Sequence, residues 1–471
     1  YIYLYGGIIV NNNIENFFCS LQNKKIAVIG MGVSHYDLIK LLRKKGLSVF
    51  VYDKRKKEQL ENYDELKNAG VEFILGENYL DSICNCDIIF RTPGMNFYND
   101  ALVKARQQGK VVTSEMEVFC EFCPCKLYAV TGSDGKTTTT TLISKMLEAS
   151  GKTVHLGGNI GRALLPIIET ISKSDVAVVE LSSFQLISMR QAPDTAVITN
   201  IAPNHLDVHK NMQEYIGAKS NIIAHQNAFS KAVLNFDNPQ TRELFSMVRG
   251  KLCYFSLKEE PYNGTFLDKD GYINRVNNGQ KVRIIHKDKI KLPGMHNVEN
   301  FLAAIAALGD EVSDQTICSV ATSFSGVEHR IEFVRELDGV KYYNDSIATS
   351  PTRTIAGLDS FNKKIIIIAG GYDKKIPYEP LAPKIIEKVK LLILLGDTAP
   401  KIEKAVKECE GYTQETPKII NVSTLEEAVE VAKKYAQDGD IVSLSPASAS
   451  FDSYKNFEQR GNHFKTVVKA L

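Results

Sequence analysis

The chain has 471 residues, which at roughly 150 residues per domain suggests about three domains. Lys plus Arg total 57 and Asp plus Glu total 55, so the formal net charge is +2 and no long block of one sign would attract a nucleic acid or an anionic membrane surface. With 44% hydrophobic residues and no apolar run near the ~18 residues that cross a bilayer, the composition predicts a soluble globular protein without a membrane span.

The first ten residues, YIYLYGGIIV, are apolar enough to compare with the core of a signal peptide. No basic segment precedes them and no small-residue cleavage site follows, so a secretory signal is not expected. The chain also does not begin with Met, which favours a trimmed or shifted start, and residues 1–22 are assigned only as a leader.

Nine cysteines in a chain of this length favour a reducing compartment over a secreted disulfide framework, and we expect a cytoplasmic protein. One group of cysteines is close enough in sequence to suggest a metal. Cys120, Cys123 and Cys125 lie in CEFCPC, with Cys84 and Cys86 upstream. Because the C-x2-C spacing of a zinc site occurs once and no His follows at ligand distance, free thiols are favoured over zinc.

Short apolar runs rich in Ile and Val recur along the chain, each followed by a stretch with helical spacing, as is typical of buried parallel strands joined by helices. The fold class is therefore α/β. In chain order, the strands are expected within residues 24–32, 47–53, 86–94, 126–132, 175–183, 195–205, 364–371, 390–397 and 440–448. Helices are expected within residues 36–46, 136–150, 297–309 and 423–436.

Two helix ends carry recognisable signals. Gly151 follows the helix at 136–150, where a glycine would act as its C-cap. Ser423 and Glu426 have the spacing of a capping box at the start of the last of these helices. Composition also favours domain boundaries near residues 112 and 326, placed only to within several residues.

The strongest chemical signal is VTGSDGKTTTTTL, residues 130–142, where a strand runs through a glycine-containing loop into a helix. Backbone N–H groups and the helix N-terminus would face one anion, to which Lys136 adds positive charge, and the expected anion is a nucleotide triphosphate. The hydroxyl of Thr137 is placed to bind Mg²⁺. Because Val130 stands where the general P-loop has Gly, this loop is a shorter form, and a simple Gly-rich turn is the alternative interpretation.

Further polar residues follow the next two expected strands. Glu180 ends one strand, where a Mg²⁺-binding carboxylate would lie beside a P-loop, and His205 and Asp207 follow the next. Lys219 comes fourteen residues after His205. Each alone would more often be a solvated position without a function, but together, after successive strands of one P-loop domain, they predict one site.

GMGVSHYD, after the first strand, is similar to the dinucleotide fingerprint G-x-G-x-x-G, and Asp53 ends the second strand. The third glycine position holds His35, so the glycine that allows close helix packing is absent. This favours a nucleotide diphosphate site over a redox NAD site.

Nine motifs, in order, resemble those of the Mur ligases of peptidoglycan synthesis. They are VTGSDGKT (130–137), GGNIG (157–161), ELSSFQL (180–186), NIAPNHLD (200–207), GAKSN (217–221), LPGMHNVEN (292–300), EHR (328–330), YNDSIATSP (343–351) and SPASASFDSYKNFEQRG (445–461). The resemblance spans about residues 25–465. Within the family, ELSSFQL and the C-terminal motif look most like the member that adds D-glutamate to UDP-N-acetylmuramoyl-L-alanine.

The resemblance implies a set of residues for ATP and for two Mg²⁺ ions. The nucleotide-binding residues would be Gly132, Ser133, Asp134, Gly135, Lys136, Thr137, Thr138, Asn297, Asn300, Arg330 and Asp345. The metal ligands would be Thr137, Glu180, His205 and Lys219, the last as a carbamate, and the catalytic group would be Lys136, Glu180, His205 and Lys219. An ammonium has no lone pair to offer a cation, whereas its CO₂ adduct is an anionic oxygen ligand.

The resemblance also implies where the other two substrates bind. The UDP-linked substrate would contact Ser34, Asp53, Arg55, Gly94 and Asn159, and D-glutamate would contact Lys374, Ser450, Phe451 and Phe457. Two positions depart from the family pattern. Ile347 stands where many relatives carry Lys, and Phe451 replaces a smaller apolar residue of some members.

Taken with the expected boundaries, the resemblance implies a Rossmann-like, UDP-substrate-binding domain at 1–112, a central P-loop ATPase domain with a mostly parallel sheet at 113–326, and a Rossmann-like, amino-acid-binding domain at 327–471. The implied reaction is ATP-dependent amide formation through an acyl phosphate, by a monomer with small-molecule partners, no nucleic acid and no membrane span. A sister Mur or folylpolyglutamate-type ligase and a P-loop switch or transporter ATPase are the alternatives. The latter would leave the last domain unexplained, and no N-K-x-D guanine signature is present.

Overall fold

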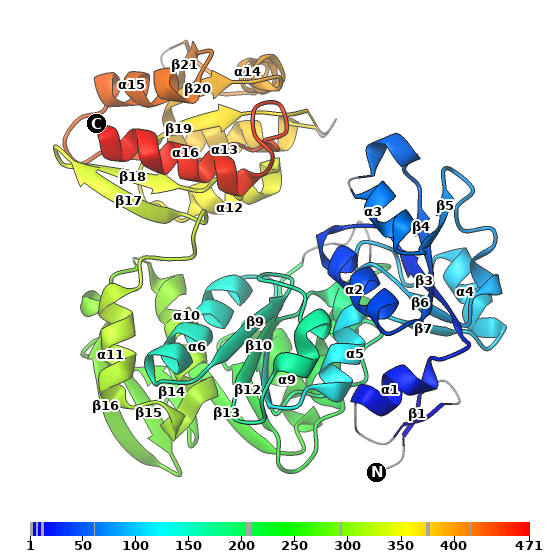
Figure 1. Ribbon diagram of the computed structural model, residues 1–471. Helices are drawn as coiled ribbons and strands as arrows, with labels where there is room; N and C mark the ends of the chain where they lie inside the picture. Colours follow the sequence, from blue (N-terminus) through cyan, green and yellow to red (C-terminus); the bar gives the residue numbers. More distant parts are fainter. Residues whose placement is uncertain are drawn as a thin grey trace. The chain divides into compact units, whose positions relative to one another are not determined.

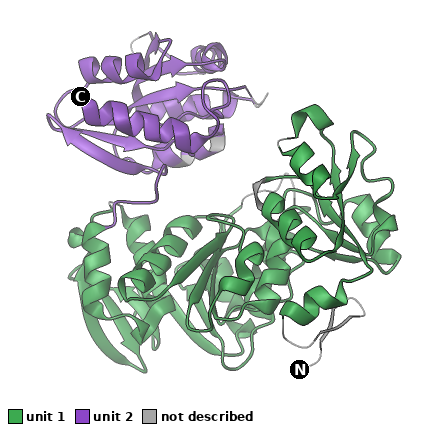
Figure 2. Cartoon of the chain, in the orientation of Figure 1, with its two compact units in different colours: residues 1–323 green, residues 324–471 purple. Residues whose placement is uncertain are grey.

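The computed structural model describes residues 3–5, 8–10, 14–60, 62–203, 209–292, 294–373, 377–414 and 416–471. The chain divides into two compact units, residues 1–323 and 324–471 (Figure 2). The first unit contains two large sheets and the second contains one, and Figure 1 labels their helices and strands. The division between the units falls three residues before the boundary expected near 326.

The N-terminal sheet of the first unit is parallel throughout, in the order β5-β4-β3-β6-β7. Its strands are β3 (Lys25–Ile29), β4 (Ser48–Asp53), β5 (Glu72–Leu75), β6 (Ile88–Phe90) and β7 (Val111–Thr113). Its helices are α2 (Val33–Lys44), α3 (Tyr63–Asn68) and α4 (Asp100–Gln107), and they are preceded by the antiparallel pair β1 (Tyr3–Tyr5) and β2 (Ile8–Val10) and by α1 (Ile14–Ser20). The strand order reverses between β3 and β6, where sheets of this kind bind ligands.

The central sheet has nine strands in the order β16-β15-β14-β13-β12-β11-β8-β10-β9. It is parallel from β9 to β14 and antiparallel over its last two pairs. The strands are β8 (Lys126–Thr131), β9 (Val154–Gly158), β10 (Val176–Glu180), β11 (Thr195–Ile198), β12 (Lys231–Asn235), β13 (Lys251–Ser256), β14 (Gly264–Leu267), β15 (Tyr272–Asn277) and β16 (Gln280–His286).

The helices of the central domain are α5 (Glu115–Phe122), α6 (Lys136–Ala149), α7 (Ser183–Leu186), α8 (Met212–Ala224), α9 (Pro239–Glu243), α10 (Met295–Leu308) and α11 (Asp314–Ser323). Helix α10 reads NFLAAIAAL over its last nine residues and is buried along nearly its whole length. A helix that is apolar all round must be covered on every side. It packs against α6 and crosses strands β12 to β14, so that it connects the P-loop side of the sheet with its antiparallel side.

The second unit has a six-stranded sheet in the order β17-β18-β22-β19-β20-β21, parallel except for the β17–β18 pair. Its strands are β17 (Glu332–Leu337), β18 (Val340–Asn344), β19 (Ile365–Gly370), β20 (Val389–Leu395), β21 (Lys418–Asn421) and β22 (Ile441–Leu444). Its helices are α12 (Pro351–Asp359), α13 (Ala382–Lys388), α14 (Ala399–Lys407), α15 (Leu425–Tyr435) and α16 (Phe457–Ala470).

Strand β19 shows why this sheet is covered on both faces. Ile365 and Ile367 join the core under α13 and α14, while Ile366 and Ile368 join the core under α15 and α16. Because successive side chains of a strand point to opposite faces, an unbroken run of Ile requires helices on both sides.

Each strand and helix expected from the sequence forms, and the α/β fold class is confirmed. The cap of α15 was placed wrongly by one residue. Thr424, not Ser423, is the N-cap, and its hydroxyl accepts a hydrogen bond from the backbone N–H of Glu427. The capping carboxylate is likewise that of Glu427, which accepts from Ser423 N at 2.8 Å. Beginning the helix at Leu425 places that apolar side chain against the core.

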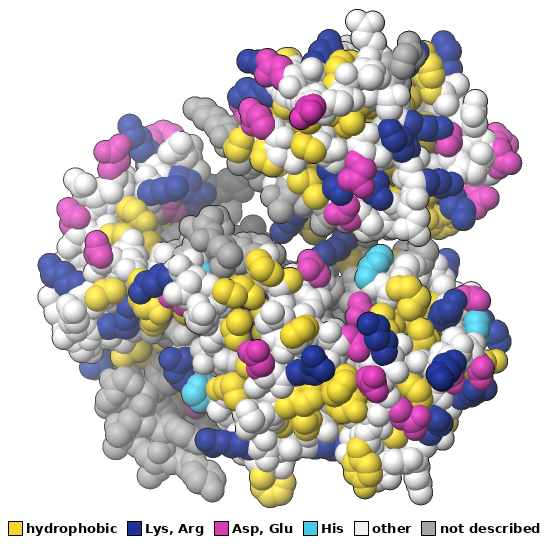
Figure 3. Space-filling view, turned by 180° about the vertical axis from the view of Figure 1, so that it is seen from behind, with side chains coloured by type: hydrophobic (Ala, Val, Ile, Leu, Met, Phe, Trp, Pro, Cys, Tyr) yellow, Lys and Arg dark blue, Asp and Glu magenta, His cyan; other side chains and the backbone are white. Residues whose placement is uncertain are grey.

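No helix in the part of the chain that the structure describes is both long enough and apolar enough to cross a membrane. On the face shown in Figure 3, basic and acidic side chains are interspersed and do not gather into a patch of one sign.

Candidate active site

The P-loop lies where β8 runs into α6, at the carboxyl edge of the central sheet. Gly132 and Gly135 have φ values of +150° and +76°, a region that favours glycine. A Cβ on Gly132 would lie 1.8 Å from the hydroxyl of Thr199, and one on Gly135 would lie 2.3 Å from Oδ1 of Asn300. The loop is therefore held closely between the end of β11 and helix α10, and neither glycine has room for a side chain.

The other P-loop residues are tied to the segment that follows β11. Ser133 Oγ contacts Ala202 O and Tyr215 OH, each at 2.9 Å, and the N–H of the exposed Asp134 donates to Asn200 Oδ1 at 2.9 Å. Lys136 opens α6, and its Nζ donates to Ser133 O at 2.9 Å, which places the ammonium over the loop.

Thr137 and Thr138 follow in the first turn of α6, with Thr137 buried and Thr138 half-buried. A helix N-terminus with these neighbours has the partial positive charge that an anion requires.

Glu180 ends β10 and is 1% exposed. Its Oε1 accepts a hydrogen bond from Asn159 Nδ2 at 2.8 Å, and the backbone N–H of Asn159 donates to Glu180 O. Its Oε2 is buried and has no hydrogen-bond partner in the described part of the chain. A buried carboxylate oxygen without a partner is costly unless a cation receives it, so this residue fits the Mg²⁺ site that the sequence predicts.

Lys219 lies on α8 and is 2% exposed. Its Nζ donates to Gly132 O at 2.6 Å, approaches Thr131 Oγ1 at 3.4 Å and lies over the ring of Tyr215. Burial, followed by the nearby charge of Lys136, lowers the pKa of Lys219 to about 6. The amine is thus mostly neutral at pH 7 and is a nucleophile. A carbamate would retain one N–H, which could still donate to Gly132 O.

His205, Asp207 and the residues between them lie outside the described residues. His209, the next described residue, is 3% exposed. Its Nε2 lies 2.9 Å from Ser183 Oγ, and its Nδ1 lies 3.2 Å from Glu214 Oε1. Its ring stacks on Phe184 at 5.4 Å. Sequence reasoning did not single out His209, although the second His of NHLDVH was visible. His209 therefore joins helix α7 to the first turn of α8.

Asn297 and Asn300 are buried on the first turns of α10. Asn300 Nδ2 donates to Asn297 Oδ1 at 3.2 Å, and Asn300 Oδ1 accepts from Thr139 Oγ1 at 3.3 Å. The pair therefore joins α10 to the P-loop helix. Their role in nucleotide binding stays a prediction.

The candidate UDP site lies at the carboxyl edge of the N-terminal sheet. Asp53 is 3% exposed, accepts from Met31 N at 2.9 Å and pairs with Arg55 Nη2 at 2.6 Å. Burial alone would raise the pKa of Asp53, but its hydrogen bonds with Arg55 and Met31 prevail and hold the pKa below its ordinary value. Gly94 lies in the loop after β6, at the same edge of the sheet. The backbone of Ser34 lies in the first turn of α2, and the side chain of Ser34 is not among the parts that the structure describes.

His35 occupies the third position of the incomplete dinucleotide fingerprint. Its Nδ1 lies 2.9 Å from Gly30 O and 3.1 Å from Ile29 O, and the side chain is 2% exposed. Burial lowers its pKa. The imidazole of His35 therefore packs under the loop after β3. A glycine at this position would have no side chain there.

The second unit holds the remaining predicted residues. Asp345 follows β18, accepts from Ser445 Oγ at 3.1 Å and Ile331 N at 3.3 Å, and burial raises its pKa to about 7. Arg330 is exposed in the segment before β17. Ile347, the departure from the family pattern, donates its backbone N–H to His329 O at 3.1 Å.

Of the predicted D-glutamate residues, Ser450 is buried after β22, and Lys374 lies outside the described residues. Phe451 is 60% exposed, with its ring 5.9 Å from that of Tyr372. Phe457 begins α16, and its ring lies edge-on to His329.

Sequence reasoning missed Arg460, which is 4% exposed. It donates to the carbonyls of Ser346, Ser448 and Ala449 at 3.0 to 3.1 Å. Arg460 therefore attaches the SPASAS loop to the loop after β18. The EQRG motif that contains it was visible, but nothing local assigns its partners.

The cysteines of the described part of the chain are free. The Sγ atoms of Cys123 and Cys125 lie 3.8 Å apart, within hydrogen-bond distance for two thiols. In the same part of the chain, no three His, Cys, Asp or Glu side chains come together as a metal site.

Three family models match this chain in order: the MurD-like N-terminal domain of Mur ligases at residues 24–114, the Mur ligase middle domain at 130–308, and the Mur ligase glutamate ligase domain at 329–448. Together they cover most of the chain, which therefore belongs to the Mur ligase family. The three-domain α/β architecture and the family resemblance seen in the sequence are both confirmed.

Within this family, the chain is 52% identical to a protein of Acetivibrio thermocellus named UDP-N-acetylmuramoylalanine–D-glutamate ligase, over 98% of this chain and all of that one. It is 50% identical, with the same coverage, to a protein of that name from Clostridium acetobutylicum. Among solved structures, UDP-N-acetylmuramate-alanine ligase MurC from Thermotoga maritima matches with a TM-score of 0.56 and 18% identity, over 95% of this chain and all of that one. This last likeness shows the fold alone.

Proposed function

We propose that this chain joins D-glutamate to UDP-N-acetylmuramoyl-L-alanine, with cleavage of ATP to ADP and phosphate. The observation that carries the proposal is the arrangement at the carboxyl edge of the central sheet. There, Glu180 and the low-pKa Lys219 lie beside the P-loop, and one buried oxygen of Glu180 has no hydrogen-bond partner among the described residues. The identity of about half of all residues with ligases of this name, over the full length, supports the amino acid chosen.

The P-loop would hold the ATP phosphates. The backbone N–H groups at the start of α6 would donate to the phosphate oxygens, and Lys136, whose Nζ contacts Ser133 O, would reach the β- and γ-phosphates. Thr137, Glu180, His205 and the carbamate of Lys219 would hold Mg²⁺ in two sites. Bound there, Mg²⁺ would neutralise the charge that develops on the phosphate oxygens during transfer.

The chemistry proceeds in two steps. The alanyl carboxylate of the UDP-linked substrate attacks the γ-phosphorus, and ADP leaves, so that an acyl phosphate forms. The D-glutamate amine then attacks the acyl carbon and loses a proton, and inorganic phosphate leaves as the amide bond forms. The contribution of the chain is mainly to hold the reactants in contact and to surround the transferred group with fixed positive charge.

Asn159 has a distinct part in this scheme. Its side chain donates to Glu180 Oε1, so that Oε2, which has no hydrogen-bond partner in the described part of the chain, could bind a cation. An amide at this position therefore fixes the rotamer of the metal-binding carboxylate, in addition to the substrate contact proposed for it. Such support of a ligand by a neighbouring group is a common requirement of metal sites.

At the N-terminal sheet, we propose that Arg55 and Gly94, with Ser34 and Asp53, receive the UDP group. Asp53 holds the Arg55 guanidinium by an ion pair and also accepts a hydrogen bond from the backbone N–H of Arg55 at 2.9 Å. Arg55 also donates to Met31 O in the loop after β3. The cation is thus fixed at the switch point of the sheet, ready for a diphosphate.

In the second unit, we propose that Lys374, Ser450, Phe451 and Phe457 receive D-glutamate. Its two carboxylates require a cation and several donors when they leave water. The loop that carries Ser450 is held by Arg460, and its neighbour Ser448 is held by Tyr378 and Thr398, each at 2.8 Å. We further propose that the chain acts as a monomer in the cytoplasm, where free thiols persist.

Phosphate release measured with ATP, Mg²⁺ and UDP-N-acetylmuramoyl-L-alanine tests the proposal. We expect release to require D-glutamate and to be far weaker with L-glutamate, L-lysine or meso-diaminopimelate. Equal release with one of these other amino acids would favour a sister ligase and overturn the assignment. Release without the UDP-linked acceptor would instead favour a P-loop ATPase of another class.

A further inference from the structure

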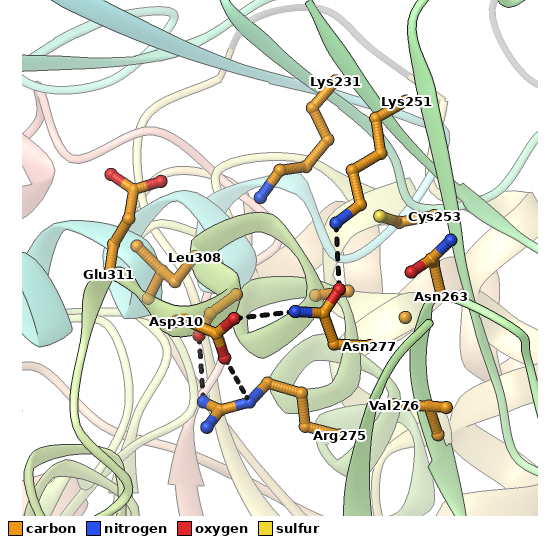
Figure 4. Close-up of a pocket in the computed structure, with 13 residues that line it drawn as sticks. Lys231, Lys251, Cys253, Asn263, Arg275, Val276, Asn277, Leu308, Asp310 and Glu311 are labelled. Carbon is orange, nitrogen blue, oxygen red and sulfur yellow. Dashed lines mark hydrogen bonds and ion pairs between the residues drawn. The ribbon is translucent and has the colours of Figure 1, made fainter. Parts of the chain in front are cut away.

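A polar cavity lies at the edge of the central sheet opposite to the P-loop. It has a volume of about 310 Å³, and Figure 4 shows the side chains around it. Lys231 and Lys251 are the first residues of β12 and β13, so they stand at the amino edge of the sheet. The P-loop follows the carboxyl end of β8, and Glu180 is the last residue of β10. The cavity is therefore separate from the active site.

The two lysines lie side by side. They are register partners on neighbouring parallel strands, and both side chains point into the cavity (Figure 4). Like charges placed opposite each other on a sheet repel and destabilise it. Burial lowers the pKa of Lys231. The charges of Lys126 and Lys251 act in the same direction, and the charge of Glu311 acts against them.

The acidic residues at the cavity already have other partners. Asp310 pairs with Arg275 Nε at 3.2 Å and accepts from Asn277 Nδ2 at 2.9 Å. Glu311 pairs with Lys126, which is not part of the cavity wall, at 2.7 Å. Arg275 in turn is shared with Asp314 at 2.8 Å.

The two lysines, by contrast, have uncharged partners. Lys231 Nζ donates to Ala307 O at 2.7 Å, and Lys251 Nζ donates to Asn277 Oδ1 at 3.1 Å. Within the described ranges, neither ammonium has a carboxylate at ion-pair distance. Each ammonium has three N–H groups, so both retain donors for a further ligand.

The bond from Lys231 to Ala307 O also has a structural role. It satisfies a carbonyl at the C-terminal end of α10, where the helix dipole favours a cation. This accounts for one charge but not for a second lysine beside it. The partial negative charge of a helix end is about half a unit, which leaves the cavity with an excess of positive charge.

We propose that this cavity binds a small anion that carries a phosphate or carboxylate group between Lys231 and Lys251. The amide of Asn263 and the backbone at Gly264 and Gly309 supply neutral polar contacts around it. The volume lies at the lower end of the range for small-molecule sites, so a metabolite of modest size fits. A dianion would remove the repulsion between the two ammonium groups and would bind more tightly than a monoanion.

Calorimetric titration of the full chain tests this inference, with inorganic phosphate in one arm and succinate in the other. A saturating non-hydrolysable ATP analogue with Mg²⁺ fills the P-loop, so that phosphate cannot be counted there. We expect at least one of the two anions to bind, and the arm that responds identifies the charged group. Lys231→Met and Lys251→Met should each weaken binding by about tenfold or more, the scale of one charge-assisted hydrogen bond.

Lys258→Met is the matched control, because it removes the same charge from an exposed lysine outside the cavity. Its affinity should stay within about twofold of that of the unaltered chain, as expected for a remote exposed charge. If Lys231→Met does not fold, Lys251→Glu decides the matter, since Lys251 is exposed and reversal of its charge should abolish binding. Absence of binding of both anions, or retention of affinity in the Lys251 variants, would overturn the proposal.

Discussion

Lys219 is held where its ammonium form is costly, and this determines what the residue can do. Its Nζ is buried against Gly132 O with the cation Lys136 nearby, and its pKa is about 6. Above pH 6 the amine is mostly neutral and can attack CO₂. The proposed carbamate therefore requires no additional base to activate the lysine. Below pH 6 the ammonium form dominates, and carbamate formation should fail.

We predict that Lys219→Ala is nearly inactive and is partly rescued by acetate, which can occupy the vacated space and supply the missing carboxylate. Lys219→Arg, which is permanently charged and fills the space, should be inactive without rescue. Activity of the unaltered chain should decline as the pH falls through about 6, in line with the pKa of this residue. Turnover measured from pH 5 to 8, with and without acetate, checks these outcomes. Normal turnover of Lys219→Ala would contradict the carbamate.

Ser450 offers a second test at this scale. It is buried in the loop that Arg460 holds, at the carboxyl edge of the second unit's sheet. We predict that Ser450→Ala raises the KM for D-glutamate about tenfold or more and changes the KM for ATP by less than about threefold, because binding lost at one ligand appears at that ligand. Ser453→Ala, an exposed serine in the same segment, is the control. We expect the same selective effect from Lys374→Ala. A rise in the KM for ATP alone would contradict the assignment of this loop to D-glutamate.

At the scale of single elements, the sequence was most informative where local rules decide the structure. The strand, loop and helix of the P-loop follow from glycines at fixed spacing and a helix start at Lys136. The placement of that loop against Thr199 and Asn300 could not be predicted, because residues so far apart in sequence meet only through the strand order. Glu180 was predicted at its strand end, but the hydrogen bond that orients it comes from Asn159 on the neighbouring strand's loop.

The strands that sequence reasoning did not predict include β14, β15 and β16, at the antiparallel side of the central sheet. In β16, QKVRIIH, exposed and half-buried residues predominate, so no apolar run marks the strand. The cap of α15 shows the limit at a helix end. Ser423 and Thr424 can both act as N-caps, and each has a Glu three residues later. The helix begins after Thr424, because this start places the side chain of Leu425 in the core.

The contact between α5 and the segment after β9 includes one buried carboxylate. Glu115 Oε1 accepts from Leu164 N at 3.1 Å and from Leu165 N at 2.7 Å. Burial raises the pKa of Glu115 to about 7, although these two hydrogen bonds favour the ionised form and oppose the rise. The folded chain therefore holds a proton that the unfolded chain releases from about pH 4.5 upward. The contribution of Glu115 to stability is fully present below that pH and is lost as the pH rises through about 7.

We predict that Glu115→Gln reduces this loss, because an amide keeps the accepting oxygen and never ionises. The difference in unfolding free energy between pH 5 and pH 8 should shrink by an amount on the order of 2 kcal/mol, relative to the unaltered chain. Urea unfolding at the two pH values measures it. An unchanged difference would mean that Glu115 is not the group that titrates in this window.

At the scale of the whole molecule, the chain has separate cores. One continuous cluster of buried residues runs through both sheets of the first unit, from Phe17 to Leu244. Arg91 adds a polar connection there, since its Nη2 donates to Phe184 O at 2.8 Å and Ser188 Oγ at 2.7 Å. The second unit has its own two clusters, on the two faces of its sheet. Such connections between distant segments are absent from the local sequence pattern, so the joining of the first two domains into one unit was not predicted.

Because each unit buries its own core, we predict that the chain unfolds in two transitions. Ile198 and Ile367 are fully buried residues in parallel strands of the first and second unit, respectively. Replacing either by Ala removes several buried carbon atoms and should cost about 2–5 kcal/mol. If the units unfold independently, Ile367→Ala should move the transition of residues 324–471 and leave the other in place, while Ile198→Ala should do the reverse. Calorimetry of both variants, compared with residues 324–471 expressed alone, assigns the transitions. A single transition that both substitutions lower alike would show instead that the two units fold as one cooperative body.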